Sequence, residues 1–367
     1  MKIGILTLPL YTNYGGILQA YALQTILKRM GHEVCLIEKR RKVWPPFWKM
    51  PFVYGKRIAK NMLGQPTPIF KEQKIYSEMS VIKQDIDQFI NKYIKRRIVD
   101  SFSEIKDTDF DMIIVGSDQI WRPPYFNNIE SAYLDFTYSW NIKRAAYAAS
   151  FGIDKWEYSP KQTERCKLLL KQFDAVSIRE DSGVNLCHQY LDREAQQMLD
   201  PTMLLRERDY IQLFEKANVI SNKGKLLNYI LDETSEKREL INKIAKDKGL
   251  KPYSIVSFYN GINSSLKSIY PSIEQWLKSF YDAEFVVTDS FHGCVFSILF
   301  NKPFIAYGNK TRGLTRFTSL LKTFNLNDRL ITNPSTTLKQ ITDINWNSVN
   351  SILTEKRDEA KKFLCNI

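Results

Sequence analysis

Residues 286–308, which read VVTDSFHGCVFSILFNKPFIAYG, constrain the fold of this chain more than any other stretch. Residues 285–287 and 304–307 are short apolar runs typical of buried strands, and residues 294–300 are apolar enough for a buried helix. Strand, helix and strand in that order form a βαβ unit with parallel strands. In open parallel sheets, ligands bind at the carboxyl ends of strands, where helix N-termini attract anions. The turn at residues 288–293 is therefore predicted to lie at a ligand site.

His292 lies at the mouth of this predicted helix. The chain has three histidines, and the other two, His32 and His188, lie in ordinary helix or helix-to-strand contexts. Asp289 and Ser290 flank His292 and could orient its imidazole or hold an anion. The alternative is structural, because a histidine at a helix start can also cap the helix or fill a polar gap. We predict a catalytic role, since imidazole transfers protons near neutral pH.

The pattern of strands and helices predicts two domains. The chain has 367 residues, which exceeds one ordinary domain, and apolar strands alternate with helices in both halves. We therefore predict an α/β fold with two Rossmann-like, doubly wound domains that face each other across a cleft. The N-terminal domain is predicted to span residues 1–204, with a basic and aromatic insertion at about 39–60. The C-terminal domain, residues 205–367, carries His292.

A glycine turn follows the first predicted strand, residues 2–8, and precedes a helix. It contains Asn13, Tyr14, Gly15 and Gly16, and the free N–H groups of the helix start would make it a substrate-binding seat for a phosphate or carboxylate. Alternatively, the two glycines only permit a tight turn and close helix packing. The full glycine fingerprint of NAD-binding domains is absent, so NAD is not predicted as a cofactor.

Polar residues also follow two further buried strands. Asp118 comes shortly after the apolar run at residues 111–115, where its carboxylate could accept a proton from a substrate hydroxyl. The alternative role of Asp118 is to cap the following turn. Arg179 follows another strand directly before a helix start and is a candidate anion clamp. Its alternative role is a salt bridge with Glu180 or Asp174.

Three cations, Lys310, Arg312 and Arg316, follow the second strand of the βαβ unit within one short loop and helix start. Lys310 and Arg312 belong to the same predicted wall of the cleft as His292, whereas Arg179 belongs to the opposite wall. We expect Lys310 and Arg312, together with Arg179, to bind an anionic substrate.

The net charge of +13 is concentrated in one segment. Eight Lys or Arg residues and no Asp or Glu lie between Lys39 and Lys60, interleaved with Trp, Phe, Tyr and Pro. This composition is typical of contact with an anionic membrane surface or an anionic acceptor. Alternatively, the segment is a solvated loop whose aromatic side chains pack on the domain. Nucleic acid is not expected as a partner, because no nucleic-acid-binding motif accompanies the charge.

The remaining composition predicts a cytoplasmic protein, peripheral to the inner face of the membrane if the basic segment binds there. The first residues do not have the pattern of a signal peptide, and no stretch reaches the roughly 18 apolar residues needed to cross a bilayer. Five cysteines are scattered through the chain without metal-ligand spacing. We expect reduced thiols and no metal site.

Five short motifs together resemble the polysaccharide pyruvyl transferase family. In chain order they are N-Y-G-G-I-L-Q-A-Y-A-L (13–23), G-S-D-Q-I-W (116–121), S-I-R-E (177–180), D-P-T (200–202) and D-S-F-H-G (289–293). The resemblance implies a glycosyltransferase-B-like arrangement of the two domains. It also implies transfer of pyruvate from phosphoenolpyruvate onto a sugar or lipid-linked oligosaccharide acceptor, giving a cyclic ketal in bacterial capsule or exopolysaccharide biosynthesis. Phosphoenolpyruvate is the donor substrate, and no other cofactor is implied.

The resemblance has one departure. Related enzymes often carry S-R-L-H-G, with Arg at the position of Ser290. This difference leaves Arg179, Lys310 or Arg312 to neutralise the donor. Two other classes remain open, a nucleotide-sugar glycosyltransferase with the same fold and a non-catalytic glycan-binding relative. With phosphoenolpyruvate as donor, His292 would act as the general acid and Asp118 as the base.

Overall fold

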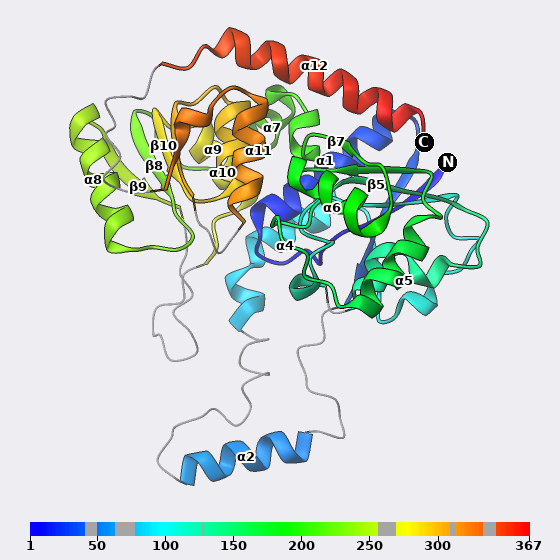
Figure 1. Ribbon diagram of the computed structural model, residues 1–367. Helices are drawn as coiled ribbons and strands as arrows, with labels where there is room; N and C mark the ends of the chain where they lie inside the picture. The colour runs from blue at the N-terminus through cyan, green and yellow to red at the C-terminus, as the bar shows by residue number, and fades with distance from the viewer. Residues whose placement is uncertain (41–49, 63–77, 127, 256–268, 309–312, 333–342) are drawn as a thin grey trace.

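The protein folds into two parallel sheets covered by helices, which confirms the predicted α/β class (Figure 1). The computed structural model describes residues 1–40, 50–62, 78–126, 128–255, 269–308, 313–332 and 343–367. The two sheets are formed by the two halves of the chain, as the alternation of strands and helices predicts. This is the glycosyltransferase-B-like arrangement that the family resemblance implies.

The N-terminal half forms a seven-stranded sheet in the order β3-β2-β1-β4-β5-β6-β7, and all its pairings are parallel. Its strands are β1 (Lys2–Leu6), β2 (Glu33–Lys39), β3 (Arg96–Val99), β4 (Met112–Val115), β5 (Lys143–Ala149), β6 (Ala175–Ile178) and β7 (Gln196–Gln197). Central strands such as β4 are wholly buried because helices cover both faces of the sheet. The strand order reverses between β1 and β4, and such a reversal leaves a crevice at the carboxyl ends of the two strands.

The C-terminal half forms a five-stranded parallel sheet in the order β12-β11-β10-β8-β9. Its strands are β8 (Lys225–Tyr229), β9 (Lys251–Ser254), β10 (Phe285–Thr288), β11 (Phe304–Tyr307) and β12 (Leu330–Ile331). Here the strand order reverses between β8 and β10. A second crevice is therefore expected where these two strands end.

The α-helices of the described part of the chain differ in length and burial. They are α1 (Tyr14–Arg29), α2 (Met50–Met62), α4 (Gln84–Tyr93), α5 (Pro160–Leu170), α6 (Asp181–Leu191), α7 (Glu207–Glu215), α8 (Ser235–Lys248), α9 (Ile273–Asp282), α10 (Phe291–Leu299), α11 (Leu314–Thr323) and α12 (Trp346–Cys365). Within the described part of the chain, none of the helices has the length and apolar character needed to cross a bilayer.

Helix α10 is buried over all nine residues and begins earlier than predicted. The apolar run predicts a helix over residues 294–300, but α10 starts at Phe291. The cause is a cap, because the Ser290 Oγ accepts a hydrogen bond from the backbone N–H of Gly293 at 3.4 Å. His292 therefore lies in the first turn of the helix and not in the loop before it.

One hydrophobic core extends across both sheets. Tyr14, the first residue of α1, stacks on Trp276 of α9 with ring centroids 5.5 Å apart and an interplanar angle of 11°. The Tyr14 hydroxyl donates to the carbonyl oxygen of Pro271 at 2.7 Å. The start of α1 is thus held against the C-terminal half of the chain.

Helix α12 follows the C-terminal sheet in sequence and returns to the N-terminal one (Figure 1). Arg357 donates to the carbonyl oxygens of Met203 and Leu205, both at 2.6 Å. The ring of Phe363 lies 6.0 Å from that of Tyr147 in β5. The predicted domain boundary falls between β7 and β8, but the assignment of α12 to the C-terminal domain stays a prediction.

Asp289 is a structural residue of the C-terminal domain. One carboxylate oxygen accepts from the backbone N–H of Leu231 at 2.6 Å, and the other accepts from Asp232 N at 3.0 Å and Lys237 Nζ at 2.7 Å. Both ends of the ion pair are buried, with Asp289 at 1% exposure and Lys237 at 4%. The hypothesis that Asp289 orients the imidazole of His292 is wrong, because its oxygens instead join the end of β10 to the loop after β8.

Replacing Asp289 with Ala should destabilise the protein by about 3–5 kcal/mol, because Lys237 would then be a buried charge without its counterion. Urea unfolding followed by circular dichroism measures this loss. The control is Glu215→Ala, which breaks the exposed pair between Arg208 and Glu215 and should cause only the small change typical of surface pairs. Equal losses in the two variants would contradict the structural role of Asp289.

Candidate active site

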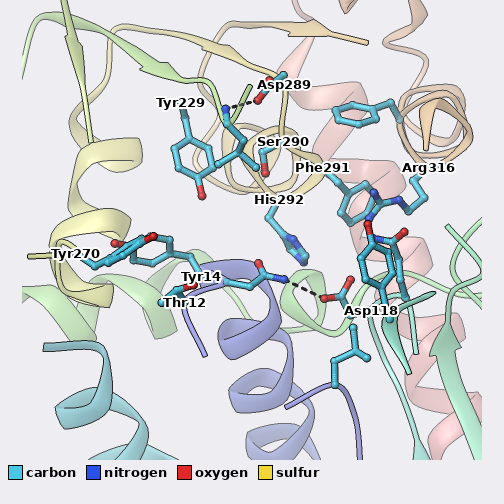
Figure 2. Close-up of a pocket in the computed structure, with 16 residues that line it drawn as sticks. Thr12, Tyr14, Asp118, Tyr229, Tyr270, Asp289, Ser290, Phe291, His292 and Arg316 are labelled. Atoms are coloured by element: carbon cyan, nitrogen blue, oxygen red, sulfur yellow. Dashed lines mark hydrogen bonds between the residues drawn. The ribbon is translucent and has the colours of Figure 1, made fainter. Parts of the chain in front are cut away.

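A cavity of about 550 Å³ lies between the two sheets (Figure 2). Its walls come from the segments at the ends of β1, β4, β8 and β10, from the first turns of α10 and α11, and from the segment just before α9. These four strands are the ones that flank the two reversals of strand order. The two crevices expected from the topology therefore open into a single cavity, and its chemistry depends on both domains.

His292 projects into this cavity from the first turn of α10 (Figure 2). Its ring lies directly against Gly15 of α1, where an added Cβ would come within 1.9 Å of the imidazole Nδ1. Its Nε2 lies 3.5 Å from a carboxylate oxygen of Asp200. The histidine is therefore positioned by one residue with no side chain and by one negative charge, both from the N-terminal half.

Asp200 is a buried carboxylate with several partners. It accepts from Arg179 Nη1 at 2.7 Å, from the Thr202 hydroxyl at 2.7 Å and from the Thr202 N–H at 3.0 Å. Burial by itself would raise the pKa of Asp200, but the contacts with His292 and Arg179 outweigh burial and hold this pKa below its ordinary value. An ionised carboxylate thus lies behind the imidazole, close to its Nε2. In the sequence, Asp200 is distinguished only as part of the D-P-T motif.

Asp118 lines the cavity from the loop after β4. One of its oxygens accepts from Asn13 Nδ2 at 3.1 Å (Figure 2). The other lies 3.5 Å from Arg179 Nη2. Its backbone carbonyl accepts from Ile120 and Ser150, which holds a left-handed conformation with φ at 62°. Such conformations are uncommon outside glycine and collect at functional sites. The structure thus presents a fixed carboxylate to a substrate.

Arg179 is buried beside the cavity and not in its wall. Its ion pairs are with Asp200 and Asp118 and not with the sequence neighbours Glu180 and Asp174 that the alternative interpretation named. Its guanidinium lies 4.5 Å from the ring centroid of Phe291, which lines the cavity. Arg179 therefore neutralises the site's carboxylates, and its predicted role as a clamp for an anionic substrate stays a prediction.

Arg316 supplies a cation to the cavity wall. From the sequence, Lys310 and Arg312 were predicted to bind the substrate, and Arg316 was not. It extends from the first turn of α11 and is 7% exposed, with its guanidinium 5.7 Å from the same Phe291 ring that Arg179 contacts. Burial, and then the nearby charge of Arg179, lowers the pKa of Arg316 to about 10. A bound anion would relieve both effects. Lys310 and Arg312 lie outside the described residues.

The glycine loop has a different role for each of its residues. Asn13 holds Asp118, Tyr14 packs on Trp276, and Gly15 allows His292 to approach. The close packing named as an alternative thus accounts for Gly15, while the predicted seat for a phosphate or carboxylate stays a prediction.

Three tyrosines line the side of the cavity opposite the charged residues. Tyr14, Tyr229 and Tyr270 lie on one side of His292, whereas Asp118 and Arg316 lie on the other (Figure 2). The Tyr229 ring packs edge-on against the same indole on which Tyr14 stacks. A rigid aromatic surface and a charged surface therefore meet at the imidazole.

The family profile described as Polysaccharide pyruvyl transferase matches residues 13–311. The chain belongs to this family. No curated protein sequence matches the chain. Within the described residues, no group of three or more His, Cys, Asp or Glu side chains is arranged to hold a metal ion. The expectation that no metal or cofactor takes part stays a prediction.

Several solved structures have a similar overall fold at low sequence identity. UDP-GlcNAc 2-epimerase from Methanocaldococcus jannaschii is 12% identical, with a TM-score of 0.47 over 96% of this chain and 92% of that protein. UDP-GlcNAc 2-epimerase from Neisseria meningitidis bound to UDP-GlcNAc is 11% identical, with a TM-score of 0.48 over 98% and 100%. UGT89C1 from Arabidopsis thaliana, complexed with UDP-L-rhamnose, is 8% identical, with a TM-score of 0.47 over 98% and 94%.

The family's five motifs form one connected network in the structure. Each contributes one residue to a chain of contacts that runs from Asn13 to Asp118, Arg179, Asp200 and His292. The motifs are distant in sequence because they end different strands and start different helices. Their convergence on one cavity identifies this network as the candidate active site.

Replacing Gly15 with Ala should displace the imidazole of His292, because the new Cβ would overlap the ring. Histidine imidazole NMR measures this directly, since only three histidines contribute signals. Gly16→Ala is the matched control in the same helical turn. Its Cβ would approach no atom closer than 3.0 Å, and the nearest atoms belong to the side chain of Asn13.

We expect the His292 resonances to shift strongly in Gly15→Ala and little in Gly16→Ala, with both proteins folded by circular dichroism. Unchanged His292 resonances in Gly15→Ala would show that the ring does not pack on α1 in solution.

Proposed function

We propose that this protein transfers pyruvate from phosphoenolpyruvate onto two hydroxyl groups of a sugar, forming a cyclic ketal. The observation that carries the proposal is His292, which projects into the cavity with the ionised Asp200 behind it and with Arg316 and Asp118 in the same cavity. Membership of the polysaccharide pyruvyl transferase family supports polysaccharide modification. We place the reaction in bacterial capsule or exopolysaccharide biosynthesis and in the cytoplasm.

The donor would bind in the charged half of the cavity. Phosphoenolpyruvate carries a phosphate and a carboxylate, and a planar guanidinium can hold either group with two hydrogen bonds. Arg316 offers that group at the cavity wall, and the free N–H groups at the start of α10 favour an anion in the same place. Lys310 and Arg312 remain candidates for the second anionic group.

His292 would act as the general acid. It gives a proton to the methylene carbon of phosphoenolpyruvate, which becomes a methyl group and leaves the adjacent carbon electron-deficient. A sugar hydroxyl attacks that carbon while Asp118 accepts the hydroxyl proton. The bond to phosphate then breaks, and a second hydroxyl closes the ketal. Two hydroxyl protons balance the one gained by carbon and the one that leaves with phosphate.

The acceptor would lie against the tyrosines. Sugar rings have apolar faces that pack on aromatic side chains, and Tyr14 is held rigidly by its stack and its hydroxyl bond. Tyr270 extends this surface beside the cavity (Figure 2). With the donor on the charged side, the two substrates would meet beside His292.

The wild-type protein should release phosphate from phosphoenolpyruvate when a suitable sugar is present, and His292→Ala should lose this activity by roughly 10²-fold or more. A phosphate-release assay over a panel of nitrophenyl and lipid-linked sugars measures both. Transfer from a sugar nucleotide without phosphate release would instead indicate a glycosyltransferase. Glycan binding with no transfer from either donor would indicate a non-catalytic relative.

Substitutions in the two halves of the cavity should affect different substrates. Arg316→Ala should weaken phosphoenolpyruvate binding by roughly tenfold or more, the scale of one lost charge-assisted hydrogen bond, and leave acceptor binding unchanged. Tyr270→Ala should raise the acceptor KM by roughly fivefold and leave phosphoenolpyruvate binding unchanged. Calorimetry with phosphoenolpyruvate and steady-state kinetics with the acceptor separate the two effects. The reverse pattern would exchange the two subsites.

A further inference from the structure

Helix α2 has an unusually exposed surface. None of its residues is buried, and Phe52, Ile58 and Met62 are 78%, 40% and 83% exposed. Figure 1 shows α2 apart from both sheets. Large apolar side chains in water are costly, so their concentration on one short helix suggests an unseen partner.

The side chains of α2 are segregated around the helix axis. At about 100° per residue, the cations Lys56, Arg57 and Lys60 fall within roughly one third of the circumference. Ile58 and Met62 fall on the opposite side, Phe52 lies between the two groups, and Val53 falls among the cations. The helix therefore has a basic side and, across from it, an apolar side that Phe52 extends.

The charge of α2 and of the segment around it limits the kind of partner that this helix can bind. The helix contains no acidic residue, and neither does the rest of the segment from Lys39 to Lys60, of which residues 41–49 lie outside the described part. Lys39 and Arg40 are occupied elsewhere, because Lys39 lies over the ring of Phe102 and Arg40 pairs with Asp100. Within α2, the guanidinium of Arg57 lies over the ring of Tyr54, at 5.8 Å from its centroid, and Lys56 and Lys60 are exposed. The positive charge of α2 therefore favours a partner with an anionic surface.

We propose that α2 docks on an anionic lipid bilayer, lying in the plane of the interface. Its apolar face would enter the boundary between headgroups and acyl chains while its cations contact lipid phosphates. A nucleic acid would neutralise the cations but leave the Met and Phe side chains in water. This docking requires no particular reaction at the cavity, although it would bring the cavity close to lipid-linked acceptors.

Co-sedimentation of the full-length protein with vesicles tests the proposal. Vesicles of phosphatidylcholine alone are compared with vesicles containing phosphatidylglycerol, at low and high salt. We expect binding to the anionic vesicles, weakened by salt and lowered about fivefold for each cation of α2 replaced by Glu. The double variant Phe52→Ser with Met62→Ser should also reduce binding, which a purely electrostatic attraction would not predict.

Two controls match these changes. Lys243, Lys246 and Lys248 are three exposed cations of α8, and their replacement by Glu alters net charge equally. Ile220 is 73% exposed outside α2, and Ile220→Ser removes a comparable apolar side chain. We expect both control proteins to bind vesicles like the wild type.

Three results would overturn the proposal. These are absence of binding to anionic vesicles at low salt, equal loss in the α8 control, or α2-dependent binding to RNA without binding to vesicles. Because α2 has no buried residue, its variants should stay folded and keep full activity toward a soluble sugar. Membrane docking and the proposed reaction can therefore fail separately.

Discussion

The buried carboxylate of Asp200 is the interaction on which the site depends. Transferring a carboxylate from water into a protein costs several kcal/mol unless cations and hydrogen-bond donors surround it. Here the partners are Arg179 from the end of β6, Thr202 from its own turn and His292 from α10. Since His292 lies in α10 of the C-terminal domain, its contact with this carboxylate also joins the two domains.

The need to balance buried charge also explains how the charged residues around Asp200 are arranged. Arg179 faces two carboxylates and a ring, so its charge is largely balanced inside the protein. Arg316 shares the Phe291 ring and is left with a lowered pKa, which an anion in the cavity would restore. The cavity therefore combines a network of paired charges with a second buried cation in its wall. Such preorganised charge is the usual basis for stabilising developing charge in a reaction.

Much of the site can be predicted from the sequence, because its residues come directly after buried strands and these strands are recognisable as apolar runs. Asp118, Arg179 and His292 were selected as polar residues after buried strands, and the structure places all three in one network. The alternative prediction paired Arg179 with its sequence neighbours Glu180 and Asp174, and this pairing is wrong. Ion pairs between strand ends join residues that are far apart in sequence, here Asp118 and Asp200. Asp200 was missed for the same reason. Arg316 follows Lys310 and Arg312 in the sequence, and only the packing of the first turn of α11 shows that Arg316 reaches the cavity.

The sequence by itself determined the α/β class, because apolar strands and helices alternate throughout and each buries its own apolar pattern locally. It also determined that His292 lies near the start of a buried helix, since the run that follows it is apolar, whereas the cap by Ser290 that moves the helix start to Phe291 appears only in the structure. Only the tertiary structure decided the order of the strands, and hence that two reversals of strand order share one cavity. It likewise decided that Asp289 supports a loop while Asp200 supports the histidine. Nothing in the local sequence distinguishes these two carboxylates, because their roles depend on which cation packing brings within reach.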